Sequence, residues 1–423
     1  MDDVIVVGAG PAGNNTALEL AIRGHSVTVI DWRQHIGDKV CTGIIGQECS
    51  RRFPVAPALV YREASCAQLI APSTDPVRFE AQTPQAQIID RVAYVASFAH
   101  RAQAAGARYL LGQRVVRVKR DAEGVTVVTA QGNHRARALV LAAGFGSHLP
   151  QQLGFGTVPD YVAGVQAMVE SRGLDQVEVQ LGSQVAPGFF SWFVPTSPGR
   201  ALVGLLARRR PQEFLNRLIE KEKSQGRIIR VVTPPASWGV PLRPLKRTYG
   251  DRVVVVGDSA GQVKPATGGG IFYSLIAGEI AANVVSAGLE SGDLSARHLR
   301  EYQIQWKDLL AQELEVGYSA RRLFECLTDK QIGTLVRQAV SAGIPADLSN
   351  AEDFSFDWHS HTIHRVMGHP ALGGALRLIN PVLARFTPRN DDGFDPDSPE
   401  GSQMAPSRKE TTAGVPDRHS NPA

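Results

Sequence analysis

The stretch VIVVGAGPAG at residues 4–13 decides the fold of the N-terminal part of this chain. Its four β-branched residues are typical of a buried strand, and they run directly into glycines spaced GxGxxG. The first glycine permits a tight turn, the second lets a pyrophosphate approach the backbone, and the third lets a helix pack on the strand. Gly8, Gly10 and Gly13 therefore predict a loop that binds dinucleotide phosphates at a helix N-terminus.

The segments that follow this loop support the same interpretation. Residues 11–23 have helical composition and Gly24 ends that helix, while residues 26–30 predict a second strand. Asp31 closes the second strand, where its carboxylate can accept hydrogen bonds from both ribose hydroxyls. The alternative is a glycine turn that binds no nucleotide, and the complete order of strand, glycines, helix, strand and acid argues against it.

Composition and charge exclude several other classes of protein. The chain has 423 residues, of which 20% are charged and 43% hydrophobic, as in ordinary globular proteins. A formal net charge of +4 without a dense basic block gives no reason to expect a nucleic-acid partner. The four cysteines form no CxxC pair, so we expect no zinc site, no other metal site and no disulfide framework.

A second glycine-rich stretch indicates which dinucleotide is bound. Residues 253–261 read VVVVGDSAG, a buried strand that ends in Gly257-Asp258, as in FAD proteins, where the acid bonds ribityl hydroxyls. Gly268, Gly269 and Gly270 then begin a helix whose N-terminus can face the pyrimidine oxygen of a flavin. The alternative role for Asp258 is that of an N-cap of the following helix. Together with the first motif, the pattern favours FAD.

The segments between these motifs predict the rest of the organisation. We expect a glycine-punctuated loop over residues 40–46, a helix over 92–105, and an antiparallel ribbon formed by 109–118 and 124–130. Residues 138–143 predict another buried strand, and 296–340 predict long helices. Short strand-like runs separated by Gly and Pro predict an inserted antiparallel sheet; they lie at residues 162–170, 177–181, 188–194 and 201–206.

These elements predict an α/β (α+β) fold: a Rossmann-type FAD-binding domain with an inserted antiparallel β-sheet substrate domain and C-terminal helices. The predicted domains, in order, are a discontinuous FAD-binding domain, a substrate domain that includes part of 60–85, a helical region, and a disordered tail rich in Pro, Ser, Asp and Gly. The FAD-binding domain covers 1–155 and 245–290, the substrate domain 156–244, the helical region 291–388 and the tail 389–423.

The stretch GDSAGQVKPATGGGI at residues 257–271 resembles the geranylgeranyl reductase family of FAD-dependent oxidoreductases, whose fold is that of p-hydroxybenzoate hydroxylase. Other segments resemble the same family, and the resemblance covers roughly residues 1–385. These segments are CTG at 41–43, PGFFSWFVP at 187–195, which is similar to the family's PxxYxWxFP signature, GVPLRP at 239–244, and residues 302–306 with 313–314.

The resemblance implies a role for particular positions of this chain. Ala12 and Asp31 would contact the pyrophosphate end and the adenosine ribose, Arg91 the phosphates, and Val115 the adenine through its backbone. The residues implied to hold the ribityl chain and the isoalloxazine are Asp258, Gly269, Gly270 and Ile271, with Cys41 and Thr42 on the other face of the flavin. Phe190 and Trp192 would line an apolar substrate channel.

The chain departs from the family pattern at several positions. Phe190 stands where the signature usually has Tyr, and Val194 stands where it has an aromatic residue. Ala143 replaces the Asp of the usual Asp-Gly after the fourth strand, and Asp31 replaces the commoner Glu. These changes keep the channel apolar but remove a phenol hydroxyl, so they bear on the substrate more than on the cofactor.

Several single residues have an alternative, purely structural reading. Cys41 is our candidate catalytic thiol, because a thiol beside a flavin can donate a proton, or else it is a small packing residue. Trp192 lines the substrate or fills the core of the sheet, and Arg91 binds phosphate or forms a surface ion pair. Lys264 lies near the flavin or is a solvated loop lysine. The histidines, including His359 and His361, have no metal-like partner set and are expected to be structural.

The resemblance implies a reductase that saturates carbon–carbon double bonds of an isoprenoid chain by hydride transfer from reduced FAD. The electrons would come from NADPH or from ferredoxin, and a second GxGxxG unit for a nicotinamide cofactor is absent from the sequence. One alternative is a flavin-dependent monooxygenase or halogenase. Another is a dehydrogenase that passes electrons between a protein partner and quinone.

The sequence also bears on location. Asp2 and Asp3 precede the first apolar run, so it does not read as a signal peptide. We find no apolar stretch of about 20 residues, the length of a membrane-spanning helix, and expect a cytoplasmic protein. Residues 371–386 could present an apolar face with two arginines to a lipid surface, so peripheral membrane contact is an open alternative.

Overall fold

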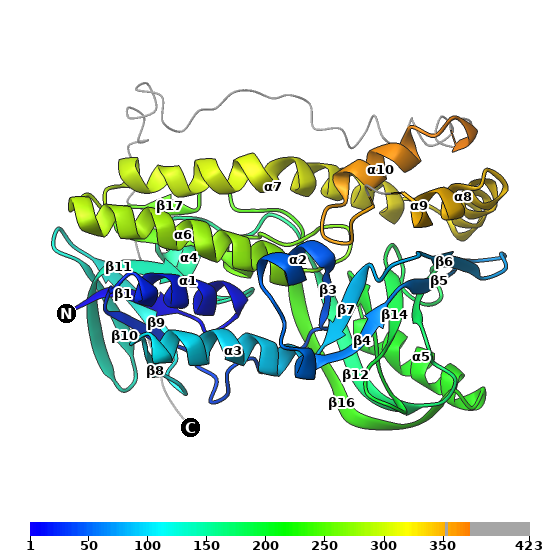
Figure 1. Cartoon of the computed structure of the whole chain (residues 1–423), viewed down its shortest axis with the longest axis horizontal. Coiled ribbons are helices and arrows are strands. Elements are labelled where there is room, and N and C mark those ends of the chain that lie inside the picture. Colours follow the sequence, from blue (N-terminus) through cyan, green and yellow to red (C-terminus); the bar gives the residue numbers. More distant parts are fainter. Residues whose placement is uncertain (352–353, 373–423) are drawn as a thin grey trace, which may run out of the picture. The chain divides into compact units, whose positions relative to one another are not determined.

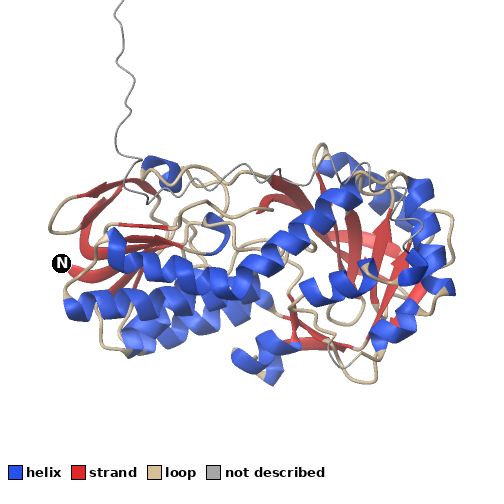
Figure 2. Ribbon diagram, turned by 90° about the horizontal axis from the view of Figure 1, so that it is seen from above, coloured by secondary structure: helices blue, strands red, loops and turns tan. Residues whose placement is uncertain are grey.

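The computed structural model of the chain describes residues 1–351 and 354–372. Two large sheets, a small third sheet and long helices make up this part of the chain (Figures 1 and 2). The predicted disordered tail at 389–423 lies outside the described residues, and so does all but the first two residues of the predicted membrane segment at 371–386.

The N-terminal sheet is the predicted Rossmann-type sheet. Its main path runs β17-β18-β11-β1-β2-β8, and β1 pairs in parallel with both β2 and β11. β18 adds to β11 in parallel, so the strands that lead into the two glycine motifs belong to one sheet. The strands are β1 (Asp2–Val7), β2 (Val27–Ile30), β8 (Arg108–Leu110), β9 (Val115–Arg120), β10 (Val125–Thr129), β11 (Gly132–Leu141), β17 (Tyr249–Gly250) and β18 (Val253–Val255).

The predicted ribbon at 109–118 and 124–130 is only partly correct. β9 and β10 pair antiparallel as expected, but β8 leaves the ribbon and pairs in parallel with β2. Gly112, at φ +71°, turns the chain between β8 and β9, and this left-handed conformation suits glycine. The strand predicted at 138–143 begins earlier, at Gly132, because its first half pairs with β10.

Alternation along β1 explains how the sheet is covered on both faces. Val4 and Val6 belong to the core shared with α1 (Pro11–Ile22), α3 (Arg91–Ala104) and α6 (Ile271–Ser291). Ile5 and Val7 point to the opposite face and join the core formed by the β9–β10 ribbon and α4 (Leu149–Gln152). All four side chains are at most 5% exposed, as expected for a sheet buried on both sides.

The second sheet has seven strands in the order β16-β12-β15-β14-β13-β5-β6. Its strands pair antiparallel except for β13 and β5, which pair in parallel. Their bounds are β5 (Cys66–Ile70), β6 (Val77–Glu80), β12 (Tyr161–Ser171), β13 (Val177–Leu181), β14 (Phe190–Pro195), β15 (Arg200–Ala207) and β16 (Ile228–Pro241), and α5 (Pro211–Ser224) packs on the sheet. The fold class expected from the sequence is therefore confirmed.

A small third sheet contradicts the loop predicted over residues 40–46. Its order is β3-β7-β4, where β3 is Ile44–Gly46, β7 is Ala86–Ile89 and β4 is Val60–Ala64. The end of the predicted loop is thus a strand, because residues 44–46 pair antiparallel with β7. The short helices α2 (Gln47–Arg52) and η1 (Pro57–Leu59) follow β3.

The long helices predicted over residues 296–340 are confirmed, and further helices follow them in the described part of the chain. α7 (Ala296–Glu325) runs above both large sheets in Figure 1 and packs along α6. Thr328 and Gln331 form a capping box that starts α8 (Asp329–Ser341), so the predicted helical run is interrupted near residue 327. The remaining described helices are α9 (Ile344–Ser349), α10 (Ser360–Met367) and the 3₁₀ turns η2 (Gly257–Ser259) and η3 (Pro370–Leu372).

Helix α6 corrects our expectation that no apolar stretch is long enough to span a membrane. α6 is 21 residues long and passes this test by length and composition, with a mean hydropathy of 1.4 over a stretch of 18 residues. Within the described structure, however, 83% of that stretch is buried inside the protein. An apolar helix surrounded by other elements is expected in the core of a large protein, so this feature is weak support for a membrane span.

Substituting Gly278, where α6 crosses α1, is expected to destabilise the protein. A Cβ atom at Gly278 would lie 2.6 Å from the carbonyl oxygen of Ala12 and 3.0 Å from the Thr16 hydroxyl. We expect Gly278→Val to lower the free energy of unfolding by about 2–4 kcal/mol, because the two helices must separate. Urea denaturation measures this, and Ala287→Val on the exposed face of α6 is the control, expected to change it by less than about 1 kcal/mol. Equal effects of the two substitutions would contradict the close crossing.

Candidate functional site

The first glycine loop contains two glycines that the protein itself requires and one that it does not. Gly8 has φ +111°, and a Cβ there would lie 2.1 Å from the carbonyl oxygen of Ala142. A Cβ at Gly13 would lie 1.9 Å from the carbonyl oxygen of Gly8. A Cβ at Gly10 would meet nothing within 4 Å in the described part of the chain. The open space at Gly10 therefore fits a pyrophosphate that approaches the backbone.

Asp31 lies directly against this loop. Its Oδ2 accepts a hydrogen bond of 2.7 Å from the backbone N–H of Ala9, and its Oδ1 accepts one of 2.7 Å from the N–H of Arg33. The side chain is 8% exposed, so these two bonds hold the carboxylate in one orientation beside the N-terminus of α1. This is the position at which an acid can meet an adenosine ribose.

The second glycine motif meets the first one in space. Gly257 follows β18 with φ +64°, and a Cβ there would lie 3.0 Å from the Cβ of Ala12. The Asp258 carboxylate forms an ion pair with Lys39. Helix α6 begins only at Ile271, and neither it nor η2 has a side-chain cap from its N-cap residue within the described structure. The alternative role of Asp258 as an N-cap is therefore wrong, and the uncapped N–H groups beside Gly270 stay available to an acceptor.

Helix α7 fixes the second motif through its buried aromatic residues. Tyr302 donates its hydroxyl to the carbonyl of Val255 at 3.0 Å and accepts a bond of 2.9 Å from the amide of Gln262. Gln262 in turn accepts from the N–H of Gly257 at 2.8 Å. Trp306, one turn further along, donates to the Thr248 hydroxyl at 2.9 Å. The segment 302–306, noted in the sequence, thus fixes the second glycine motif from behind through Val255 and Gln262.

Arg91 is buried, so its alternative as a surface ion-pair partner is wrong. It begins α3 and is 7% exposed, and one terminal nitrogen donates to the carbonyls of Gly37 and Lys39, the latter at 2.5 Å. Its Nε atom is buried and has no hydrogen-bond partner among the described residues. A buried guanidinium N–H needs an acceptor, so this atom fits a cofactor phosphate, while the role itself stays a prediction.

The predicted channel residues form part of an aromatic wall, which we define as Phe190, Trp192 and Trp238. The ring centres of Phe190 and Trp192 are 5.9 Å apart, and those of Trp192 and Trp238 are 6.4 Å apart. A Cβ at Gly204 would lie 2.4 Å from the Trp192 indole, and one at Gly164 would lie 2.8 Å from the Trp238 indole. Both indoles therefore pack directly over a glycine. The sequence motif reveals Trp192 but not Trp238, which lies on β16.

The wall lies close to both loops that would enclose the flavin. A Cβ at Gly268, beside Gly269 and Gly270, would lie 3.4 Å from Val240 and 3.6 Å from Leu206 of the seven-stranded sheet. The carbonyl of Cys41 accepts a hydrogen bond from the same sheet. The structure thus brings together the predicted loops at Cys41 and Gly269 with the predicted wall. Val115, the first residue of β9, belongs to the other sheet, whose strand β2 leads into Asp31.

Lys264 is not solvated. It is 4% exposed, and its Nζ donates to Asp357 Oδ1 at 3.1 Å and to the Phe356 carbonyl at 2.9 Å. Burial lowers the pKa of Lys264, and the charge of Asp357 opposes that shift. The expectation of a solvated loop lysine is therefore wrong. Asp357 also accepts from the N–H groups of Gly46 and Cys49, the latter at 2.9 Å, at the start of α2.

A second buried carboxylate holds the same C-terminal segment. Glu313 on α7 accepts from the N–H groups of His359 at 2.6 Å and of Ser360 at 3.0 Å, where α10 begins. Burial lowers the pKa of His359 to about 4, so its ring is neutral at pH 7, and its Nε2 lies 2.9 Å from the Phe356 carbonyl. The segment 356–360 therefore bonds three elements at once: Glu313 on α7, Cys49 on α2, and Lys264 in the loop that precedes α6. We call this segment the clasp.

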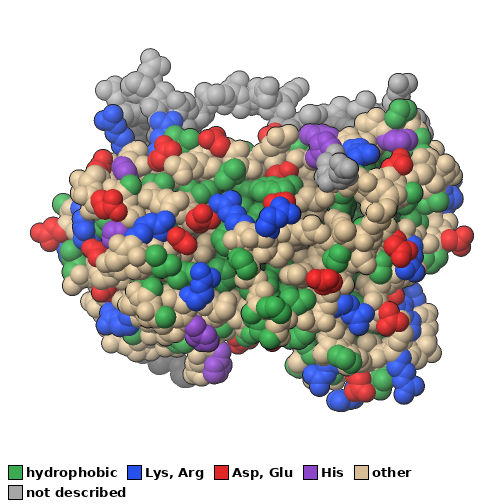
Figure 3. Space-filling model, in the orientation of Figure 1, with side chains coloured by type: hydrophobic (Ala, Val, Ile, Leu, Met, Phe, Trp, Pro, Cys, Tyr) green, Lys and Arg blue, Asp and Glu red, His purple; other side chains and the backbone are tan. Residues whose placement is uncertain are grey.

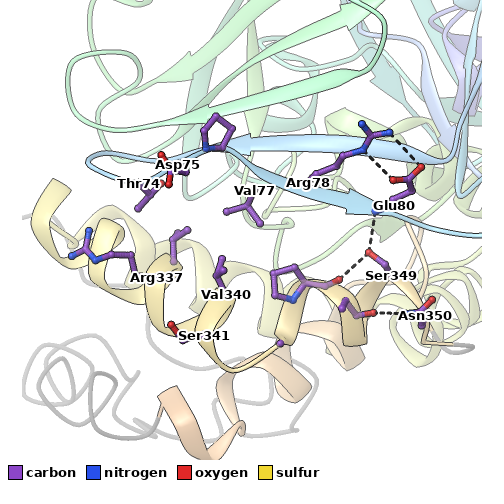
Figure 4. A pocket seen from close by; sticks show the side chains of 15 residues that line it. Thr74, Asp75, Val77, Arg78, Glu80, Arg337, Val340, Ser341, Ser349 and Asn350 are labelled. Atoms are coloured by element: carbon purple, nitrogen blue, oxygen red, sulfur yellow. Dashed lines mark hydrogen bonds and ion pairs between the residues drawn. The ribbon is translucent and has the colours of Figure 1, made fainter.

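One large cavity of the described structure lies away from these loops. It has a volume of about 630 Å³ and lies between the β5–β6 hairpin and helices α8 and α9 (Figure 4). Figure 4 shows Val77 and Arg78 on one side of it and Val340 and Ser349 on the other. Its lining comes from residues 74–80 and 336–350, so it is separate from the loops at Gly10 and Asp258.

The combination of this fold and these two loops defines an FAD-dependent oxidoreductase. The family model described as FAD dependent oxidoreductase matches residues 45–284, and the NAD(P)-binding Rossmann-like domain model matches residues 6–59. The digeranylgeranylglycerophospholipid reductase of Methanothrix thermoacetophila is 29% identical over 81% of this chain and 92% of its own length. A second such reductase, from Methanopyrus kandleri, is 30% identical over 79% of this chain and 89% of its own length.

Solved structures agree on the fold. A geranylgeranyl bacteriochlorophyll reductase-like protein from Thermoplasma acidophilum has a TM-score of 0.76 at 22% identity, covering 89% of this chain and 99% of that one. The halogenase PltM, solved with phloroglucinol and FAD, has a TM-score of 0.64 at 15% identity, covering 90% and 86%. The chain belongs to the geranylgeranyl reductase family of FAD-dependent oxidoreductases, and its cofactor is FAD.

The Lys264–Asp357 pair yields a testable asymmetry. Asp357→Ala leaves a buried ammonium without its carboxylate and two N–H groups of α2 without an acceptor, so we expect a loss of about 3–5 kcal/mol in unfolding free energy. Lys264→Met leaves Asp357 with its backbone donors and should cost less, about 1–3 kcal/mol. Urea denaturation of both variants and of the double variant measures the coupling.

As the control, Glu80→Ala, which removes an exposed pair with Arg78, should cost less than about 1 kcal/mol. Equal losses for Asp357→Ala and Glu80→Ala would contradict the clasp.

Proposed function

We propose that this protein saturates carbon–carbon double bonds of an isoprenoid chain, using electrons held by its FAD. The observation that carries the proposal is the aromatic wall facing the Cys41 and Gly268 loops. Two relatives whose names describe them as digeranylgeranylglycerophospholipid reductases support the substrate class. When bound, FAD supplies the hydride for such a reaction, and the protein supplies binding, orientation and the exclusion of water.

The residues of this chain account for binding and orientation. The wall offers the partly buried rings of Phe190 and Trp238, while Trp192, 6% exposed, packs beside both of them over Gly204. Apolar aromatic surface of this kind suits an unsaturated hydrocarbon chain. The predicted roles of Asp258, Gly270 and Ile271 would hold the ribityl and ring portions across from this wall. Cys41, half-buried in its loop, remains our candidate for the acid that delivers a proton to the alkene.

Monooxygenase or halogenase chemistry remains the second candidate. It is favoured only by the shared fold, because the halogenase PltM resembles this chain at 15% identity. Two features argue for the reductase instead: the higher TM-score of 0.76 to the geranylgeranyl reductase-like structure, and relatives of reductase name across most of the chain.

The proposed activity can be tested without oxygen. The protein is reduced with dithionite and mixed with geranylgeranyl diphosphate or a digeranylgeranyl glycerophospholipid, while the flavin absorbance is followed. We expect the flavin to reoxidise and the lipid to gain whole pairs of hydrogen atoms by mass spectrometry. Reoxidation only after oxygen is admitted, with the lipid mass unchanged, would contradict the reductase.

Replacing Cys41 tests its role as the proton donor. We expect Cys41→Ala to keep its FAD and to slow alkene-dependent reoxidation at least about a hundredfold, a typical contribution of a positioned acid. Cys66→Ala is the matched control, since Cys66 is also a half-buried free cysteine but lies on β5. It should react at the wild-type rate. A wild-type rate for Cys41→Ala would leave the thiol as a packing residue.

Peripheral membrane contact belongs to the same proposal, because an isoprenoid lipid is poorly soluble in water. Figure 3 shows basic and acidic side chains interspersed on the face it presents, so charge alone does not mark a lipid-binding surface there. We expect a cytoplasmic protein that sediments in part with liposomes containing the glycerophospholipid. Absence from the pellet at every lipid composition would end this part of the proposal.

A further inference from the structure

Gln166 connects two parts of the site that lie far apart in the sequence. It lies on β12 and is 4% exposed. Its side-chain Oε1 accepts a hydrogen bond of 3.1 Å from the indole N–H of Trp192. Its Nε2 donates a hydrogen bond of 3.2 Å to the backbone carbonyl of Cys41. One amide group therefore bonds the wall with one end and the Cys41 loop, residues 40–43, with the other.

The bond to Trp192 crosses an entire strand. Trp192 on β14 is opposite Gly204 on β15, and Gly204 is opposite Gln166 on β12. The indole must therefore extend over Gly204 to reach a strand that is two places away, about 10 Å in the direction of the sheet. A Cβ at position 204 would lie 2.4 Å from the indole and block this path. The glycine and the glutamine thus act together to place one indole.

The neighbouring strand β16 pairs irregularly with β12 beside Gln166. The pairing of β12 with β16 shifts register between Gln166 and Met168, whose partners are Ala236 and Thr233. Pro234 and Pro235 lie in the gap, and proline has no N–H to donate to a ladder. Bulges of this kind bend a strand and redirect side chains, and they occur next to active sites.

The Cys41 loop is also held from its other side. The N–H of Ile89, at the end of β7, donates to the carbonyl of Gly43 at 2.9 Å. Gly43 has φ +67°, and a Cβ there would lie 2.7 Å from the carbonyl of Ile89. The loop is thus fixed to the small third sheet at Gly43 and to the seven-stranded sheet at Cys41. Gln166 supplies the second of these attachments through a side chain.

We infer that Gln166 is a positioning residue, which fixes the Cys41 loop at a set distance from the Trp192 face of the wall. The inference rests on the proposed function, in which an alkene lies between this wall and the flavin beside Cys41. A small displacement of a reacting group from its productive position costs up to about a hundredfold in rate. Gln166 therefore governs the chemical step and leaves the reactivity of the flavin toward other oxidants unchanged.

The test compares isosteric variants in the anaerobic assay with FAD bound. Gln166→Leu keeps the side-chain size and removes both hydrogen bonds, and we expect alkene-dependent reoxidation to fall at least about tenfold. Reoxidation by oxygen should stay within about twofold of the wild-type rate, since Cys41 and the wall take no part in it. Trp192→Phe keeps an aromatic face but removes the indole N–H, and it should cause a similar fall. The double variant should fall no further than the single ones.

Gln180→Leu is the matched control. Gln180 lies on β13 of the same sheet and is also 4% exposed, but its side chain bonds neither Cys41 nor Trp192. We expect it to react at the wild-type rate with alkene and with oxygen. A wild-type alkene rate for Gln166→Leu, an equal loss for Gln180→Leu, or a strictly additive double variant would overturn the inference.

A second measurement separates this inference from the proposed function. The rate at which iodoacetamide alkylates Cys41, followed by peptide mass spectrometry with Cys66 as an internal reference, reports on the loop without turnover. We expect Gln166→Leu to raise the Cys41 rate at least about threefold and to leave Cys66 unchanged. If wild-type protein fails to reduce alkenes but this change occurs, the proposed function fails and the positioning role stands. An unchanged Cys41 rate overturns the positioning role even if alkenes are reduced.

Discussion

The close approach of backbone at Ala12 is the constraint on which the rest of the site depends. Two cofactor motifs separated by about 245 residues meet there, because Gly257 leaves room for the Ala12 side chain and Gly278 leaves room for its carbonyl. Both positions require glycine, because a Cβ atom at either one would lie 3.0 Å or less from an atom of Ala12. This approach places the open ends of α1 and α6 beside each other, so one extended cofactor can bind both N-termini.

The C-terminal segments hold the second glycine motif and the loop that follows it in place. Tyr302 and Gln262 fix the strand end at Gly257, while Asp357 binds Lys264 at the start of the next loop and the first turn of α2. Buried ion pairs contribute little net stability when both partners are present, but an arrangement that separates them is costly because it leaves an uncompensated buried charge. The clasp at 356–360 therefore sets the position of the flavin loop relative to α2, which follows the Cys41 loop and β3 in the chain.

Much of the fold follows from local patterns, whereas much of the site depends on long-range register. The glycine motifs, the inserted sheet and the long helices are readable because each pattern lies within about 20 residues. Trp238, Gln166 and Asp357 escaped sequence reasoning, since their significance comes from partners on distant elements. Lys264 was misread for the same reason: its carboxylate lies 93 residues further along the chain. A weak signal did exist in the alternation of Gly164 and Gln166 along one strand, since a glycine beside a buried amide leaves room there for a large side chain from a neighbouring strand.

The wall also bears on why this fold serves a reductase in one family and oxygen chemistry in another. The fold is shared with the halogenase PltM at a TM-score of 0.64, so the scaffold does not choose the reaction. The choice must come from the groups that face the flavin. Here two indoles over glycines and a half-buried Phe190 form an apolar cluster, and Gln166, the polar group that contacts Trp192, has both ends bonded. A face without free polar groups suits a hydrocarbon substrate, because leaving a buried donor or acceptor unpaired against an alkene would cost binding energy.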